Sequence, residues 1–242
     1  MYNEGNNIGV HLQTIKDEMY KHSLLYKVLI LNDGSTDSSP AIVNQFTKHM
    51  PLLKVDHDVN KGLGTTFADL FREASKLTNE QDIIITMDSD STHHPSYIPS
   101  LIQKIHEGYD VVIASRFATG GKQIGFATYR KLCSFGARIL LHIVFHLHGV
   151  RDYTCGYRAY RAAVVKNYVS QYDPYLIESK GFPGVAEILI KMSTATPLKI
   201  TEIPLVLRYD LKQSMSKMKL ASTIREYLKL ILITKFSKRR KQ

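Results

Sequence analysis

Short apolar runs alternate with amphipathic stretches along the first half of the chain. Aliphatic and β-branched runs predict strands at Lys27–Leu31, Leu52–Asp56, Asp82–Met87 and Asp110–Ala114. Helical patterns lie between them, from Thr36 to about His49, over Thr66–Leu77, and onward from Pro95. This alternation predicts a doubly wound α/β fold, with a mostly parallel sheet flanked by helices and ligands bound beyond the carboxyl ends of its strands.

The second half of the chain is less regular. Tyr129–His148 has helical periodicity, with apolar positions on one face at Leu132, Phe135, Ile139, Leu140 and Ile143. Thr201–Leu207 is predicted to be a strand. Lys219–Phe236 intersperses apolar and basic residues, which predicts a basic amphipathic helix that either packs on the protein body or lies on a membrane surface. No repeat or linker interrupts the pattern, so we expect one domain over residues 1–207 and a C-terminal extension over 208–242.

The positive charge of the protein is concentrated in that extension. The 242 residues contain 32 Lys and Arg against 22 Asp and Glu. Residues 208–242 hold 11 of the basic and 2 of the acidic residues, so they carry almost the whole net charge of +10. Such an arm either docks on a polyanion or serves as a solubilising tail. An anionic membrane or a phosphorylated substrate fits better than nucleic acid, because no aromatic and basic platform accompanies it.

Composition narrows the class of protein further. At 44% hydrophobic and 22% charged residues, the chain has the composition of a globular domain. No apolar run reaches the ~18 residues of a membrane-spanning helix, and no leader peptide is recognisable at the start. The two cysteines, Cys133 and Cys155, provide neither a disulfide framework nor a zinc-site spacing. We therefore expect a protein of the cytoplasm.

Acidic residues follow the strongest predicted strand. Asp88-Ser89-Asp90 places two carboxylates one residue apart directly after it, where they repel each other unless a cation lies between them. A divalent ion with oxygen ligands, shared with a diphosphate, is the natural candidate, and a solvated acidic loop is the alternative. The neighbouring His94 is interpreted as structural, with His93 as a weaker candidate ligand.

Six motifs follow one another along the chain, namely Tyr2-Asn3-Glu4, Asn32–Asp37, Asn60–Gly64, Asp88–Asp90, Ser115–Phe117 and Asp152–Arg158. In their order and spacing these motifs resemble those of glycosyltransferase family 2, in particular the dolichol-phosphate mannose and glucose synthase group. Gly181-Phe182, Glu187, Ile203-Pro204, Arg208 and Ser216–Met218 fit the same group, so the resemblance covers nearly the whole chain.

The resemblance implies a fold of GT-A type and an inverting, metal-dependent transfer of a hexose from GDP-mannose or UDP-glucose. Asp88 and Asp90 would place Mg²⁺ or Mn²⁺ on the donor diphosphate, with Asp90 counted among the catalytic residues. The resemblance assigns the remaining contacts with the nucleotide to Tyr2, Glu4, Asn32, Asp33 and Lys217.

The resemblance also implies a polyprenyl or dolichyl phosphate acceptor, used by an enzyme lying peripherally on the cytoplasmic face of a membrane. Its phosphate would be gripped by Arg116, Arg130 with Ser134, and Arg208. A phosphate is already anionic and attacks the sugar without a general base. A hydroxyl acceptor, the alternative, would need one from Asp152 or Glu187, with Thr154 in the same acceptor loop.

Two departures from the family pattern bear on these expectations. Members normally begin with an apolar strand before the Tyr2-Asn3-Glu4 motif, and that first strand is missing here. A truncated, inactive homologue is therefore a further alternative. An aspartate is more usual at the position of Asn32, which leaves the base of the donor open.

Overall fold

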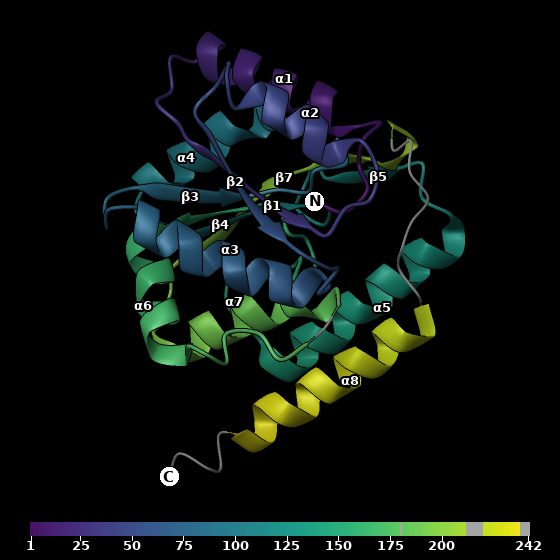
Figure 1. The fold of residues 1–242 in the computed structure, drawn as a ribbon. Coiled ribbons are helices and arrows are strands. Elements are labelled where there is room, and N and C mark those ends of the chain that lie inside the picture. The colour runs from purple at the N-terminus through teal and green to yellow at the C-terminus, as the bar shows by residue number, and fades with distance from the viewer. Residues whose placement is uncertain (180, 212–219, 238–242) are drawn as a thin grey trace.

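Helices cover both sides of a central layer of strands in the computed structural model, which describes residues 1–179, 181–211 and 220–237 (Figure 1). One side carries α1 (Ile8–Lys21), α2 (Ser39–Phe46) and α4 (Ile98–His106). The other side carries α3 (Leu63–Leu77), α6 (Ala162–Tyr172) and α7 (Pro183–Ala195). The remaining helical segments are α5 (Thr128–Phe145), α8 (Leu220–Ser237) and the 3₁₀ turns η1 (Pro95–Tyr97) and η2 (Tyr209–Leu211).

The strands form parallel pairs with one antiparallel exception. β1 (Val28–Asp33) and β2 (Leu52–His57) pair in parallel. A second sheet has the order β3 (Ile83–Thr86), β6 (Arg158–Arg161), β4 (Val111–Ser115) and β7 (Ile200–Pro204). Within it β6 runs antiparallel to β3 and β4, whereas β4 and β7 are parallel, as are the short strands β5 (Lys122–Ile124) and β8 (Val206–Arg208). The predicted α/β fold with parallel strands flanked by helices is confirmed.

The core is centred on β4. All five residues of this strand are buried, because β6 and β7 pair with its two edges and helices cover its faces. A strand covered on both faces has no polar side, which explains the continuous apolar run in the sequence. α3 contributes Phe67 and Phe71 to this core and begins at Leu63, three residues before its predicted start, after Gly62 with its φ of 87°.

A gap separates the two-stranded sheet of β1 and β2 from the four-stranded sheet that begins with β3. The facing segments Val28–Leu31 of β1 and Ile83–Met87 in and after β3 line a cavity of about 1510 Å³. Met1 lies at one end of it: its ammonium nitrogen donates to the Leu31 carbonyl at 2.8 Å, and its carbonyl accepts from the Asp33 amide at 2.8 Å. This is the bond pattern of a parallel bridge with β1. No described strand fills the rest of the gap.

Helix α8 packs with one face only. Tyr227 and Leu230 are buried, whereas Ile224, Leu228 and Leu232 are exposed. Helix α5 exposes the apolar positions that the sequence placed on one face, namely Leu132, Phe135, Ile139, Leu140 and Ile143. In the part of the chain that the structure covers, no helix combines the length and the apolar character needed to cross a bilayer.

Candidate active site

Polar residues at the carboxyl ends of neighbouring strands open into the same cavity. Asp33 closes β1, Asp88 and Asp90 follow β3, and Arg116 follows β4; all four line the cavity. The four residues come from three segments spread over 83 positions of the sequence, and the topology gathers them at one edge of the strand layer.

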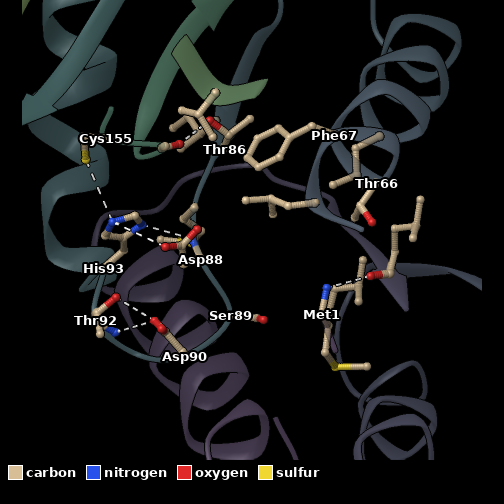
Figure 2. Close-up of a pocket in the computed structure, with 18 of the residues that line it drawn as sticks. Met1, Thr66, Phe67, Thr86, Asp88, Ser89, Asp90, Thr92, His93 and Cys155 are labelled. Atoms are coloured by element: carbon tan, nitrogen blue, oxygen red, sulfur yellow. Dashed lines mark hydrogen bonds and ion pairs between the residues drawn. The ribbon is translucent and has the colours of Figure 1, made fainter. Parts of the chain in front are cut away.

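The loop after β3 holds its two carboxylates differently. Asp90 is buried, and its Oδ1 accepts from the amide and the hydroxyl of Thr92 at 3.1 and 2.6 Å (Figure 2). The side chain of Asp88 is 46% exposed. Met1 lies across the cavity from this loop. Asp90 is therefore fixed by its own loop, while Asp88 is the more accessible carboxylate.

The buried side chain of His93 bonds to the backbone of this loop. Its Nδ1 accepts from the Asp88 amide at 3.0 Å, which puts a proton on Nε2, facing both Asp88 Oδ2 and Cys155 Sγ at 3.9 Å. The ring also stacks on Tyr157, with centroids 5.1 Å apart. With both nitrogens engaged, His93 is a support of the loop.

The acidic pair suits a hard divalent cation. Among the described residues no cluster of three or more His, Cys, Asp or Glu side chains could hold a metal alone. Mg²⁺ and Mn²⁺ favour oxygen ligands, and Mg²⁺ is typically held by one or two carboxylates plus water and substrate phosphates. Asp88 and Asp90 fit that ligand set, with the remaining positions left to a diphosphate and water.

At the opposite wall, Asp33 is held by backbone amides. Its Oδ1 accepts from the Lys61 amide at 2.8 Å and its Oδ2 from the Gly62 amide at 3.0 Å. Tyr2 and Glu4 line the cavity nearby, and Glu4 Oε2 accepts from Asn7 at 2.9 Å.

The neighbouring Asn32 is oriented differently. Its Nδ2 donates to Asp56 at 2.9 Å, and its Oδ1 accepts from the Ser35 amide at 3.1 Å. The Asn32 side chain is thus committed to β2 and the following turn, and it is not part of the cavity lining.

Arg116 forms a bidentate pair with Asp152. The guanidinium Nε and Nη2 donate to the two carboxylate oxygens at 2.8 and 2.7 Å, and Nη2 also donates to Thr154 at 2.5 Å. Asp152 is fully buried; burial raises its pKa, but Arg116 outweighs this and leaves the pKa below its ordinary value. Asp152 is therefore a buried carboxylate whose charge Arg116 compensates.

The other predicted acceptor residues are dispersed. Ser134 on α5 lines the cavity, and its hydroxyl has no hydrogen-bond partner among the described residues. Arg130 lies one turn earlier on α5, but its side chain is outside the described part, as is Lys217 altogether. Arg208 pairs with the exposed Asp210 at 2.8 Å and does not line the cavity. The structure thus brings Arg116 and Ser134 to the cavity, and leaves Arg208 outside it.

The second candidate general base, Glu187 on α7, is equally constrained. It is buried, its two oxygens accept from the amides of Glu178 and Ser179 at 2.8 and 2.9 Å, and it pairs with Lys191 at 2.6 Å.

His57 was not among the site residues predicted from the sequence. This residue ends β2 and contacts Asp33 at 2.7 Å. Its position at a predicted strand end, as for Asp33, was the available signal.

Comparison with known proteins places these features in a family. The model of glycosyl transferase family 2 matches residues 1–169. The dolichol-phosphate mannosyltransferase of Pyrococcus furiosus is 31% identical over 231 residues, which cover 95% of this chain and 60% of that protein. The undecaprenyl-phosphate mannosyltransferase of Micrococcus luteus is 29% identical over 205 residues, covering 84% of this chain and 79% of the relative. The chain thus spans three fifths of the length of the first relative and most of the second.

A solved structure shares the fold. The glucosyl-3-phosphoglycerate synthase of Mycobacterium tuberculosis, in complex with Mn²⁺, uridine diphosphate and glucosyl-3-phosphoglycerate, aligns with a TM-score of 0.65 at 18% identity. The alignment covers 97% of this chain and 76% of that one, which confirms the predicted GT-A-type fold. With motifs, fold and relatives in agreement, the chain belongs to glycosyl transferase family 2.

Proposed function

We propose that this protein is an inverting hexosyltransferase that moves mannose or glucose from GDP-mannose or UDP-glucose to a polyprenyl or dolichyl phosphate. The observation that carries the proposal is the single cavity onto which Asp33, Asp88, Asp90, Arg116 and Ser134 all open. A shared cavity supports a mechanism in which donor and acceptor meet in one space. Two relatives that act on lipid phosphates according to their names support the choice of acceptor.

In this proposal the donor lies across the cavity between β1 and β3. Asp33, already accepting from two amides, takes a further N–H from the base, and Tyr2 and Glu4 line the same end. Asp88 and Asp90 hold Mg²⁺ or Mn²⁺ against the donor diphosphate. The bound cation supplies the neutralisation that the departing nucleoside diphosphate requires. Lys217, assigned to the nucleotide by resemblance, is outside the described residues.

The state of the candidate bases favours a phosphate acceptor over a hydroxyl. Asp152 already accepts from Arg116 and Thr154, and its lowered pKa makes it a poor proton acceptor. Glu187 is occupied by two amides and Lys191. A phosphate oxygen needs no base, because it is anionic near neutral pH. Transfer to a hydroxyl of a saccharide or lipid remains the second candidate and requires one of these carboxylates to be released.

The acceptor phosphate is proposed to bind at the Arg116 side of the cavity. Ser134 offers a hydroxyl there, and Arg130 is one helical turn away on α5. Arg208 joins the phosphate by exchanging Asp210 for it. Its pair with Asp210 is solvent-exposed, and exposed ion pairs contribute little to stability, so the exchange costs little.

The exposed apolar positions of α5 and α8 are proposed to rest on the membrane that carries the acceptor. Residues 1–207 form the transferase domain in this view, and the basic extension 208–242 binds the anionic cytoplasmic leaflet.

A transfer assay tests the proposal. Purified protein with Mn²⁺ and labelled GDP-mannose or UDP-glucose is given a polyprenyl phosphate or the polyprenol of the same length. We expect product only with the phosphate, and a loss of about 100-fold in Asp90→Asn but not in Asp17→Asn, an exposed carboxylate on α1. Product on the polyprenol would favour the second candidate. No product and no nucleotide binding would favour an inactive homologue.

A further inference from the structure

A chain of ionisable side chains in contact with one another leads away from the donor side of the cavity. His57, at the end of β2, contacts Asp33 Oδ1 through Nδ1 at 2.7 Å and Asp69 Oδ2 through Nε2 at 3.0 Å. On α3, Arg72 donates to Asp69 Oδ1 at 2.6 Å, and it also donates to Asp173 at 2.7 Å. The network therefore connects β1, β2, α3 and the end of α6.

The chemistry of the imidazole sets the role of His57. Each ring nitrogen of His57 faces a carboxylate oxygen at hydrogen-bond distance, Nδ1 toward Asp33 and Nε2 toward Asp69. Because both nitrogens are held, the ring cannot flip or rotate without breaking one bond. Its side chain is only 6% exposed, which makes a broken bond costly.

His57 acts on Asp33 from behind the cavity. Asp33 lines the cavity, whereas His57 and Asp69 are not part of its lining. Asp33 Oδ1 is shared by His57 and the Lys61 amide, and Oδ2 receives the Gly62 amide. Two oxygens with about four lone-pair sites thus have three donors, which leaves acceptor capacity for one ligand N–H.

We propose that His57 is a positioning residue of the donor site, which, braced by Asp69 and Arg72, fixes the orientation in which Asp33 presents its remaining acceptor to the nucleobase. The inference rests on the proposed function in that it requires a nucleotide to bind at Asp33. It assigns to His57, Asp69 and Arg72 a part in donor affinity, although none of them lines the cavity.

The electrostatics of Asp33 agree with this geometry. Burial raises the pKa of the Asp33 carboxyl, but the hydrogen bond from His57 and those from the amides of Lys61 and Gly62 outweigh burial and lower the pKa overall. Asp33 is therefore kept as a carboxylate, the form that accepts from a base N–H.

Nucleotide affinity measured by titration calorimetry, with UDP or GDP in the presence of Mn²⁺, tests the proposal. We expect His57→Ala to weaken binding about 10-fold, a size typical for loss of a group that orients a ligand-contacting residue. Asp69→Asn removes the charge of the brace but keeps an acceptor, so the loss should be smaller and in the same direction. His49→Ala, an exposed histidine after α2, is the matched control and should bind as the unaltered chain does.

A double-mutant cycle separates positioning from general destabilisation. If His57 works through Asp33, His57→Ala costs affinity in the unaltered chain but costs nothing further in an Asp33→Asn background. Equal costs in both backgrounds, or an unchanged affinity in His57→Ala, would overturn the proposal. Failure of the unaltered chain to bind either nucleotide would instead refute the proposed function, so the two failures are distinguishable.

Discussion

The gap between β1 and β3 allows a direct test of how the sheet is completed. In β1, residues 28, 30 and 32 turn their backbone groups toward β2, because the Val28 amide donates to the Pro51 carbonyl at 2.8 Å on that side. Leu29 and Leu31 therefore turn theirs toward the cavity, on the side where Met1 is bonded. A Val-Ile-Val-Ile extension placed before Met1 would continue the parallel bridge along β1 and fill the apolar part of the cavity.

The expected gain follows from what four such residues would bury. Four aliphatic side chains contribute about 2 kcal/mol each when buried. Register with β1 adds four ladder bonds, at about 1 kcal/mol each. Ordering the backbone and side chains of four residues costs about 2.2 kcal/mol per residue. The net stabilisation is about 3 kcal/mol, which for a domain of this size raises Tm by about 6–12 °C.

Thermal unfolding followed by circular dichroism measures this shift, and a proline variant provides the control. In the extension, the first and third residues point their amides at the Lys27 and Leu29 carbonyls. Pro-Ile-Pro-Ile keeps an apolar extension of the same length but lacks these two donors. Hydrogen exchange supplies an independent readout, since the Leu29 and Leu31 amides should be more strongly protected in the Val-Ile-Val-Ile chain than in the Pro-Ile-Pro-Ile chain, where the two missing donors weaken the same bridge.

Equal changes of Tm with both extensions, while the amides of Leu29 and Leu31 exchange as fast as before, would contradict this prediction. That result would mean that any stabilisation came from nonspecific burial of the added side chains and that the gap does not accept a strand in register with β1.

Three further outcomes are expected. The lowered pKa of Asp152 contributes stability that is complete well above pH 4 and is lost as the pH falls below it, because protonation leaves Arg116 without its counterion. Asp152→Asn should therefore lower Tm at pH 7 and flatten the decrease of Tm with falling pH. An unchanged dependence of Tm on pH would contradict this. Leu228→Asp on α8 should weaken sedimentation with anionic vesicles about tenfold, whereas Gln171→Asp, exposed on α6, should not. Glu187→Gln should cost about 2 kcal/mol of unfolding free energy, because the Glu187 carboxylate accepts from two amides, and the transfer rate per folded molecule should be retained. A loss of transfer rate without a loss of stability would instead identify Glu187 as a catalytic base.

The strands and the residues at their ends could be predicted because each signal is local. β4 is a run with both faces buried, and β1 and β3 carry polar residues directly at their carboxyl ends. Once the strands are parallel, geometry alone brings Asp33 and Asp88 to one edge. Neither step requires knowledge of distant contacts.

Other elements were missed for identifiable reasons. α7 is buried nearly all round, so it has no polar face to reveal a helical period. β6 has four residues, and its antiparallel insertion between β3 and β4 depends on the whole sheet. α1 could have been found, since its buried residues Ile8, Leu12, Ile15 and Met19 recur at helical spacing. The predicted strand Thr201–Leu207 is two strands, because β7 and β8 pair with different partners.

Within the site, pairings between distant residues could not be predicted. Arg116 and Asp152 are 36 positions apart, and sequence alone could assign either residue to substrate without showing that they hold each other. The same holds for His57, whose two carboxylates lie on β1 and α3. A motif shows which residue types are present, whereas the tertiary structure decides which of their bonds are already used.

The gap between β1 and β3 and the proposed donor site are parts of one cavity, so a strand added in the gap should also affect nucleotide binding. The β1 edge that would pair with an added strand is the same edge that ends in Asp33, and Met1 already bonds to the Asp33 amide. The side chain of Asp33 is thus held from the β2 side by His57, and its backbone is held from the opposite side by the residue that pairs with the edge of β1, here Met1. An added strand should tighten nucleotide binding together with stability, and in His57→Ala it should recover part of the lost affinity. If stability rises while nucleotide affinity stays constant, the two halves of the cavity are independent, and the orientation of Asp33 is set by β2 and α3 alone.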